Sequence, residues 1–388
     1  MSALLPGATL GVLGGGQLGR MFVHAAQRMG YFTAVLDPDP DSPAGRVSHH
    51  HIHTDYTDVD GLARLAGLAD AITTEFENVP APALVHLSVA RPVSPAAEAV
   101  AIAQDRIREK AHFVRCGVAC APHAVIETAD QLAAVSGDLL PGILKTARLG
   151  YDGKGQQRVG TRAELAAAWE ATGDVPCVLE KLLPLDFECS VIVARGGDGQ
   201  IVHYPPQRNL HRDGVLAVTE VHADSMPDAI ARQAVAATQS IAQGLDYVGV
   251  LCVEFFVLAD GELVVNEMAP RPHNSGHWTM DACDMSQFEQ QVRTLAGLPL
   301  NMPRQHSPAI MLNLLGDLWF LDDGTEQAPR WADVLALPGI HLHLYGKAEA
   351  RRGRKMGHLT ITGADIGEVR STADFAAALL GLPIPLSE

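Results

Sequence analysis

The sequence predicts an α/β protein with a mixed α+β part, built from two or three domains and beginning with a parallel β-sheet. Three observations support this prediction. The chain has 388 residues, which exceeds the size of one ordinary hydrophobic core. Short apolar strands alternate with helices over residues 1–95, whereas strands predominate over residues 184–300. Finally, 47% hydrophobic and 19% charged residues are typical of a globular protein that folds in water.

The N-terminal part shows the order βαβαβ. Strands are predicted at Thr9–Leu13, Thr33–Leu36 and Ala71–Phe76, and helices at Gln17–Met29 and from about Asp58 to Leu68. Parallel strands need crossover connections, which are usually helices that cover the sheet. This order therefore predicts a Rossmann-like parallel sheet with helices on both faces.

The middle of the chain is expected to hold a linking helix and a small lid domain. A long helical stretch covers roughly Pro95–Cys116. A strand at Gly142–Thr146 leads to a glycine loop at Gly150–Gly155. Thr161 and Glu164 then have the spacing of a capping box, which predicts that another helix begins after Thr161.

Strands are expected to predominate in the rest of the chain. Residues 184–300 contain one predicted helix, at Pro227–Gln243, beside several strands. Residues 301–388 contain predicted strands at Ala309–Leu315, His341–Leu344 and Leu359–Ile361, with helices near Trp331 and Ala373. We therefore expect an N-terminal domain (1–95), a linker and lid (96–183), a central domain with a metal-binding hairpin (184–300) and a C-terminal mixed β region (301–388).

The charge balance and the cysteines exclude several classes of protein. A net charge of −16 argues against a general nucleic-acid or anionic-membrane binder, although a local basic cluster can still bind a phosphorylated small molecule. No apolar run is long enough for a membrane span, and the first 13 residues lack the basic start of a signal peptide. The six cysteines form no C-x-x-C pair and are typical of reduced core residues in a cytoplasmic protein.

Two glutamates on either side of one turn form the most informative local pattern. Asp260-Gly261 is a strong hairpin signal between two apolar runs, and pairing the strands around it places Glu254 opposite Glu267. Like charges across a ladder repel, so such a pair is normally tolerated because a cation lies between them. With the amide oxygen of Asn266 nearby, these ligands suit Mg²⁺. Two solvated acids on an exposed sheet face are the alternative.

A second pattern follows the first predicted strand. Residues Gly14–Gly19 match G-x-G-x-x-G, and Asp37 follows at the offset of a ribose-binding acid. This pattern favours an NAD-dependent oxidoreductase. However, the backbone N–H groups of a helix N-terminus accept any anion, including a nucleotide phosphate. A purely structural tight turn is also compatible with the pattern.

Three further segments carry polar residues at high density. The loop Gly150–Gln156, with Lys145 on the strand before it, suits a flexible phosphate cover but is not a Walker A loop. The segment from Asn266 to Thr279 restricts Arg271 between two prolines and suits a small anion. The basic residues of the third segment, which also suit an anion or a solvated face, are Lys347, Arg351, Arg352, Arg354 and Lys355.

Four histidines lie close together near the expected edge of the N-terminal sheet. They superficially resemble a metal-binding tract, but we interpret them as the end of a surface strand. They are His49, His50, His51 and His53.

Taken in order along the chain, seven segments resemble the ATP-grasp superfamily and, within it, the N5-carboxyaminoimidazole ribonucleotide synthetases of purine biosynthesis. The resemblance covers nearly the whole chain and implies an ATP-grasp fold. The segments are GVLGGGQLGRM, TTEFENVP, QDRIREK, GYDGKGQ, NLHRDGVL, NEMAPRPHNSGHWT and YGK…GRKMGHL.

The resemblance implies a role for each matching residue. Those expected around ATP are Arg106, Lys145, Gly150, Tyr151, Asp152, Gly153, Lys154, Gly155, Gln156, Glu180, Lys181, Leu182, Leu183, Glu188, His211, Asn266 and Glu267. Glu254 and Glu267 would hold Mg²⁺, and Arg271, His273 and Asn274 would surround bicarbonate. Those expected to face aminoimidazole ribonucleotide are Gln17, Leu18, Glu75, Tyr151, Asp152, Lys154, Lys347 and Arg354.

The implied activity is carboxylation of 5-aminoimidazole ribonucleotide with ATP and bicarbonate, through carboxyphosphate. The implied protein is a cytoplasmic homodimer that binds small molecules and neither nucleic acid nor membranes. Three alternatives stay open at this point. They are an ATP-grasp ligase that activates formate or another carboxylate, a nicotinamide-dependent oxidoreductase, and a nucleotide-binding regulator without catalytic activity.

Overall fold

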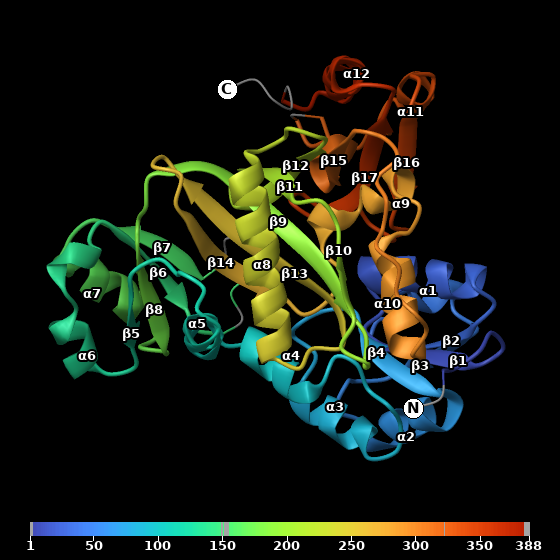
Figure 1. The fold of residues 1–388 in the computed structure, drawn as a ribbon, viewed down its shortest axis with the longest axis horizontal. Coiled ribbons are helices and arrows are strands. Elements are labelled where there is room, and N and C mark those ends of the chain that lie inside the picture. Colours follow the sequence, from blue (N-terminus) through green and yellow to red (C-terminus); the bar gives the residue numbers. More distant parts are fainter. Residues whose placement is uncertain (1–2, 149, 151–154, 322, 384–388) are drawn as a thin grey trace.

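The computed structural model describes residues 3–148, 150, 155–321 and 323–383. Within these ranges the strands form three sheets, which the ribbon in Figure 1 shows in different parts of the molecule. A parallel sheet lies near the N-terminus, a small antiparallel sheet forms the lid, and a large antiparallel sheet connects the two. None of the helices in the described ranges is long and apolar enough to cross a membrane.

The N-terminal sheet confirms the predicted parallel arrangement. Its strands have the order β3-β2-β1-β4, and all neighbours are parallel. The histidine tract supplies an additional edge strand. The elements are β1 (Thr9–Leu13), α1 (Gln17–Arg28), β2 (Phe32–Asp37), β3 (His50–His53), α2 (Val59–Leu68), β4 (Ala71–Thr74) and α3 (Ala81–Ser88). Strand β4 ends two residues before the predicted end, which leaves Glu75 in the following loop.

The expected long linking helix is wrong, because two helices occupy that stretch. Helix α4 (Ala97–Ala103) ends before Gln104, and α5 (Arg106–Arg115) begins after Asp105. The Asp105 side chain accepts hydrogen bonds from the N–H groups of Ile107 and Arg108 and so caps α5. The break brings Arg106 to the start of a helix, from which its side chain reaches the central sheet.

The lid is a four-stranded sheet of order β5-β8-β6-β7. Its elements are β5 (His123–Ile126), α6 (Ala129–Ala134), β6 (Gly142–Thr146), β7 (Gln156–Val159), α7 (Arg162–Ala171) and β8 (Cys177–Lys181). The Thr161 hydroxyl accepts from the Glu164 N–H, as predicted, but the Glu164 carboxylate accepts from the Gly160 N–H at 2.6 Å. Only one of the two hydrogen bonds of the predicted capping box is therefore present at the start of α7. A complete one, between Thr128 and Gln131, begins α6.

The large sheet has the order β14-β13-β9-β11-β12-β15-β17-β16, with β10 paired to β9. Its strands are β9 (Leu185–Arg195), β10 (Ile201–His203), β11 (Gln207–Arg212), β12 (Val215–Val221), β13 (Gly249–Leu258), β14 (Leu263–Ala269), β15 (Ala309–Leu315), β16 (Ile340–Leu344) and β17 (Lys355–Thr362). Strands from residues 184–300 and 301–388 thus share one sheet. The division into four domains stays a prediction.

Helices cover this sheet, and two of them were not predicted. Helix α8 (Asp228–Gly244) lies where a helix was predicted, while α11 (Trp331–Leu335) and α12 (Ile366–Leu380) lie near the C-terminus. Residues 184–300 also contain the short α9 (Thr279–Ala282) and the longer α10 (Gln287–Ala296), so the expectation of one helix is wrong. Phe288 and Val292 of α10 share a core with Phe22 of α1, which joins the central sheet to the N-terminal domain.

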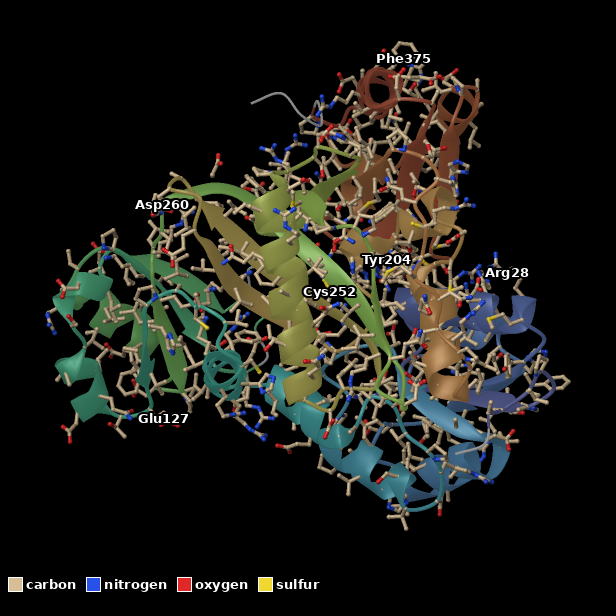
Figure 2. The ribbon with its side chains drawn as sticks, viewed as in Figure 1. Arg28, Glu127, Tyr204, Cys252, Asp260 and Phe375 are labelled. Atoms are coloured by element: carbon tan, nitrogen blue, oxygen red, sulfur yellow. The ribbon has the colours of Figure 1, made fainter. Side chains whose placement is uncertain are left out.

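The largest core lies between α8 and the strands β9, β13 and β14. Figure 2 shows Tyr204 and Cys252 in the interior, whereas Arg28 and Phe375 lie at the periphery. All six cysteines are unpaired, and four of them are buried. This packing holds the strand β13 rigidly beside its neighbours, and β13 carries one of the two predicted metal ligands.

Candidate active site

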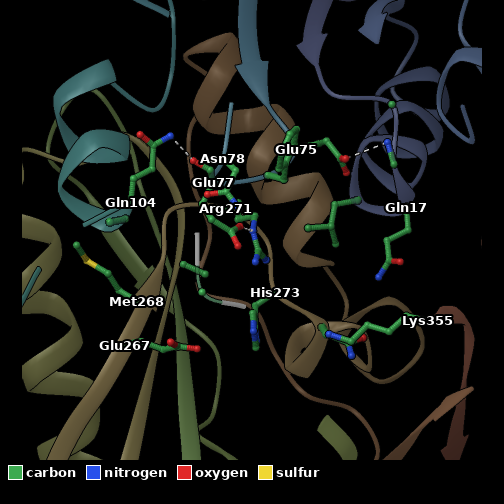
Figure 3. Close-up of a pocket in the computed structure, with 18 of the residues that line it drawn as sticks. Gln17, Glu75, Glu77, Asn78, Gln104, Glu267, Met268, Arg271, His273 and Lys355 are labelled. Carbon is green, nitrogen blue, oxygen red and sulfur yellow. Dashed lines mark hydrogen bonds and ion pairs between the residues drawn. The ribbon is translucent and has the colours of Figure 1, made fainter. Parts of the chain in front are cut away.

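Two cavities meet between the three sheets. The first, of about 510 Å³, lies between the N-terminal sheet and the central sheet, and Figure 3 shows its lining. The second, of about 680 Å³, lies between the lid and the central sheet. The residues that line both cavities are Arg106, Glu254, Glu267, His273, Asn274 and Lys355. The predicted metal pair therefore lies at the junction.

The predicted hairpin is confirmed, and so is the pairing of its two glutamates. Glu254 on β13 pairs with Glu267 on β14, and a bulge follows Glu254. Glu267 Oε2 lies 3.1 Å from Arg106 Nη1. Glu254 is buried, and among the described residues its Oε1 atom accepts no hydrogen bond of normal geometry; His273 Nε2 lies 3.4 Å away. A buried carboxylate oxygen without a partner is costly, so this position suits a bound cation.

The electrostatics of Glu254 agree with that interpretation. Burial, opposed by His211 and reinforced by Glu267 and Glu188, raises the pKa of Glu254 from 4.5 to about 7. The charged form is thus disfavoured until a positive charge arrives. A divalent ion would supply that charge, and the hard oxygen donors of Glu254 and Glu267 fit Mg²⁺.

Three charged residues beside the metal pair form two buried ion pairs. Lys145 and Lys110 each lie 3.1 Å from one carboxylate oxygen of Glu180, and all three side chains are buried. Burial alone would raise the pKa of Glu180, but the two lysines hold it below its ordinary value. Lys145 also donates to the amide oxygen of Asn266 at 3.5 Å. Both carboxylate oxygens of Glu180 are therefore paired with lysines. Any contact between adenine and the segment Glu180–Leu183 would then be made by the backbone. Lys110 was not predicted.

Most residues predicted around ATP line the second cavity. They are Arg106, Lys145, Gln156, Glu180, Lys181, Leu182, Leu183, Glu188, His211, Asn266 and Glu267. Gly150 lines the first cavity instead, and Gly155 precedes β7 with a positive φ of 71°. Tyr151, Asp152, Gly153 and Lys154 lie outside the described residues.

His211 and Glu188 face each other in the second cavity. The His211 Nδ1 atom forms an ion pair with Glu188 across β11 and β9. Burial would lower the pKa of His211, but Glu188 and the nearby Glu254 raise it above its ordinary value. When it is protonated, His211 adds positive charge beside the predicted nucleotide site.

The glycine turn before α1 is occupied by carboxylates of the same chain. Glu75 accepts hydrogen bonds from the N–H groups of Gly16, at 2.9 Å, and Gly19, at 3.0 Å. Asp37 accepts from the Gly15 N–H at 2.6 Å and from the Tyr56 hydroxyl at 2.6 Å. Asp37 is thus committed to the turn, which does not favour its predicted use as a ribose ligand of a nicotinamide cofactor.

The segment from Arg271 to Asn274 lies where the two cavities meet. Arg271 makes an ion pair with Glu77, an unpredicted partner 194 positions away, visible in Figure 3. The charge of Glu77 outweighs burial and raises the pKa of Arg271. Both amide atoms of Asn274 are buried and have no hydrogen-bond partner among the described residues. This amide can therefore bind a ligand with one donor and one acceptor.

The basic segment divides between the cavity and the surface. Lys347 donates to Gln17 at 2.8 Å, and both line the first cavity. The other predicted substrate contacts in this cavity are Leu18, Glu75 and Arg354. Arg351 pairs with Glu349 on the exposed surface, so this arginine takes no part in the cavity.

The histidine tract forms no potential metal site in the described part of the chain, where only Asp281, His343 and His358 bring three ligand atoms within 4.8 Å of one another. The rings of His343 and His358 stack at 4.6 Å with planes 16° apart. The in-plane lone pairs of nearly parallel rings do not converge on one point. This group of side chains therefore suits hydrogen bonding better than coordination of an ion.

Comparisons with known proteins agree with this arrangement. Residues 7–104 match the ribonucleotide synthetase preATP-grasp domain, residues 111–288 the ATP-grasp domain, and residues 309–372 the phosphoribosylaminoimidazole carboxylase C-terminal domain. The fold and the paired cavities thus define an ATP-grasp protein of the ribonucleotide synthetase type.

The curated relatives identify the family within that class. The N5-carboxyaminoimidazole ribonucleotide synthase of Brucella melitensis is 45% identical over 362 residues, which cover 92% of this chain and 97% of the relative. That of Pseudomonas aeruginosa is 41% identical, covering 96% of this chain and 99% of the relative. The chain belongs to the family of N5-carboxyaminoimidazole ribonucleotide synthases.

Solved structures extend the similarity to the fold. An ADP complex of an N5-carboxyaminoimidazole ribonucleotide synthetase has a TM-score of 0.89 and 37% identity, covering 97% of this chain and 98% of that one. The Aspergillus clavatus enzyme in complex with ADP and 5-aminoimidazole ribonucleotide has a TM-score of 0.87 and 31% identity, covering 97% and 100%.

Proposed function

We propose that this chain carboxylates 5-aminoimidazole ribonucleotide with ATP and bicarbonate, giving N5-carboxyaminoimidazole ribonucleotide, ADP and phosphate. The observation that carries the proposal is the junction of two cavities at Glu254 and Glu267. ATP would lie between the lid and the central sheet, with its γ-phosphoryl group directed at the junction. Aminoimidazole ribonucleotide would enter from the N-terminal side, so that the two substrates meet where bicarbonate is activated.

In the first step, a bicarbonate oxygen attacks the γ-phosphorus of ATP, the bond to the β-phosphate oxygen breaks, and ADP leaves. Catalysis of phosphoryl transfer consists mainly of positioning and charge neutralisation. Lys145 and Arg106 supply positive charge on the nucleotide side. Arg271, which lines the first cavity, would hold the carbonate group together with the free Asn274 amide. Bound Mg²⁺, held by Glu254 and Glu267, would neutralise charge on the phosphate oxygens.

In the second step, the exocyclic amine attacks the carbonyl carbon of carboxyphosphate, or of CO₂ released from it. The new C–N bond forms, inorganic phosphate leaves, and the amine loses a proton. Enclosure between the cavities would protect the labile intermediate from water. Asp152 is proposed to orient the amine or to accept its proton, and an unchanged carboxylation rate in Asp152→Asn would remove that role.

The test measures ADP release with all combinations of bicarbonate and aminoimidazole ribonucleotide, together with the carboxylated product. We expect product only when both are present with ATP. ADP release with formate instead of bicarbonate would favour the other ligase. NADH binding that quenches or enhances its fluorescence would favour the oxidoreductase, and ATP binding without turnover would indicate a regulator.

A cytoplasmic homodimer is part of the same proposal. Six unpaired thiols fit a reducing compartment. The homodimer itself is carried by the family resemblance alone. Light scattering of the purified chain, whose mass is 41.3 kDa, distinguishes a dimer from a monomer.

A further inference from the structure

Gln287 lies outside both cavities, yet its side chain holds a residue that lines both. It is the first residue of α10 and is completely buried. Its Oε1 atom accepts from the His273 N–H at 2.9 Å, and its Nε2 atom donates to the His273 carbonyl oxygen at 2.8 Å. One amide therefore satisfies both backbone groups of His273, as a neighbouring β-strand would.

The direction of this amide is determined by its partners. A backbone N–H can only donate and a carbonyl can only accept, so Gln287 cannot be reversed without losing both bonds. Its Nε2 atom also donates to His277 Nδ1 at 3.1 Å. The segment between His273 and His277 is thus fastened at both ends by one side chain. Gly276 within it has no room for a Cβ atom, which would lie 2.7 Å from Gln287 Oε1.

The held segment orients the His273 ring. The Ser275 N–H donates to His273 Nδ1 at 3.3 Å, and the Ser275 hydroxyl lies 2.9 Å from the same atom. Because the backbone N–H needs an acceptor, Nδ1 carries the lone pair and Nε2 carries the proton. That Nε2–H faces Glu254 at 3.4 Å, beside the unpartnered amide of Asn274. A small displacement of this backbone would misdirect both side chains.

We propose that Gln287 is a positioning residue for bicarbonate activation, acting through the backbone of His273. This inference rests on the proposed function of the junction. Gln287 touches no substrate in this arrangement; it keeps the segment from Arg271 to Asn274 in register with the hairpin. Its loss should therefore affect bicarbonate more than ATP, whose cavity is lined mostly by the lid and by the strands β9, β11, β13 and β14; His273 and Asn274 reach that cavity only at the junction.

Helix α10 offers a matched control. Gln290 is also completely buried, but its Nε2 atom donates to the Asn301 carbonyl oxygen at 2.8 Å, away from both cavities. The test compares Gln287→Met with Gln290→Met by measuring kcat, KM for bicarbonate, KM for ATP and Tm. We expect Gln287→Met to lower kcat/KM for bicarbonate by about 10- to 100-fold, as misplaced reacting groups do, with a nearly unchanged KM for ATP.

The possible outcomes distinguish a positioning role of Gln287 from a purely structural one. Gln290→Met should lower Tm while leaving the kinetic constants within about twofold of wild type, because it removes a buried hydrogen bond remote from the site. Bicarbonate kinetics of Gln287→Met that match those of Gln290→Met would overturn the positioning role.

If Gln287→Met does not fold, Gln287→Glu is the second test, because it keeps the oxygen facing the His273 N–H but loses the donor to the His273 carbonyl oxygen. A wild-type KM for bicarbonate in that variant would also overturn the role. A wild-type chain without bicarbonate-dependent ADP release would refute the proposed function itself.

Discussion

The hairpin β13–β14 and the glycine turn before α1 both bring two carboxylates to the same cavity, but only in the turn do both find hydrogen-bond donors within the described part of the chain. Glu75 accepts two backbone hydrogen bonds and Asp37 accepts two more from Gly15 and Tyr56. Glu254, in contrast, has an oxygen without a hydrogen bond among the described residues. Burial raises the pKa of both Glu75 and Glu254, and in the turn two N–H groups oppose the rise.

This difference indicates how the two regions meet ligands. A carboxylate whose charge is already balanced acts as a fixed acceptor that shapes a pocket. A buried carboxylate that lacks a partner is unfavourable by itself and becomes favourable when a cation binds. The hairpin is therefore the part of the site that is completed by a ligand, and the turn is the part that is complete before a ligand arrives.

The largest expected effect follows from removing a carboxylate of the hairpin. Glu267→Ala should lower bicarbonate-dependent ADP release by at least about 100-fold, comparable to losing a main electrostatic group of an active site. Glu262→Ala is the control, because Glu262 lies exposed in the turn of the same hairpin. Tm should be measured for both variants, since the first leaves Arg106 without its partner. A residual rate near that of wild type would contradict the metal assignment.

A smaller effect should appear in the pH dependence of stability without metal. Glu254 binds its proton up to about pH 7 when folded, but only to about pH 4.5 when unfolded. The folded state therefore holds more protons between these values, and the free energy of unfolding falls as pH rises through them. Glu254→Gln lacks this penalty and should be more stable than wild type by about 1–3 kcal/mol at pH 8, with little difference near pH 4.5.

Urea unfolding of Glu254→Gln, Glu262→Gln and wild type at several pH values measures this difference. The exposed Glu262 variant should follow wild type. Added Mg²⁺ and ADP should stabilise wild type more than Glu254→Gln, since ligands that bind only the folded state raise its stability. Parallel pH curves for Glu254→Gln and wild type would show that the carboxylate is not strained in the empty protein.

Local sequence signals predicted the hairpin well. Asp260-Gly261 and the apolar runs around it predicted the hairpin and the pairing of Glu254 with Glu267, but they did not predict the bulge. Next to the turn Val257 pairs with Leu263, and the register shift after Glu254 brings the two glutamates opposite each other. The break between α4 and α5 also had a local signal, because Asp105 is a favoured N-cap residue. Helix α10 was harder to predict, since buried glutamines interrupt the apolar periodicity of its inward face.

Partners distant in the sequence could not be predicted in this way. Glu77 and Arg271 are 194 positions apart, and no local pattern relates them. The same holds for Lys110 and Glu180, which meet only because α5 packs beside β8. Sequence motifs therefore identified many of the residues that line the cavities, whereas the charge pairs that hold them depend on tertiary packing.

The smallest effect should come from the glycine turn, because its acid is already satisfied within the chain. Glu75→Gln keeps one acceptor oxygen but presents an NH₂ group to the second backbone N–H, and it removes the charge that favours the N-terminus of α1. A loss of about 1.4 kcal/mol would raise the KM for aminoimidazole ribonucleotide by about tenfold. The KM for ATP should not change, since Glu75 lines only the first cavity. Glu170→Gln, an exposed acid at the end of α7, is the control. Equal KM values for the ribonucleotide in both variants would mean that the turn supports the fold but does not shape the substrate pocket. The turn would then have a structural role only, whereas the hairpin would have a role in catalysis.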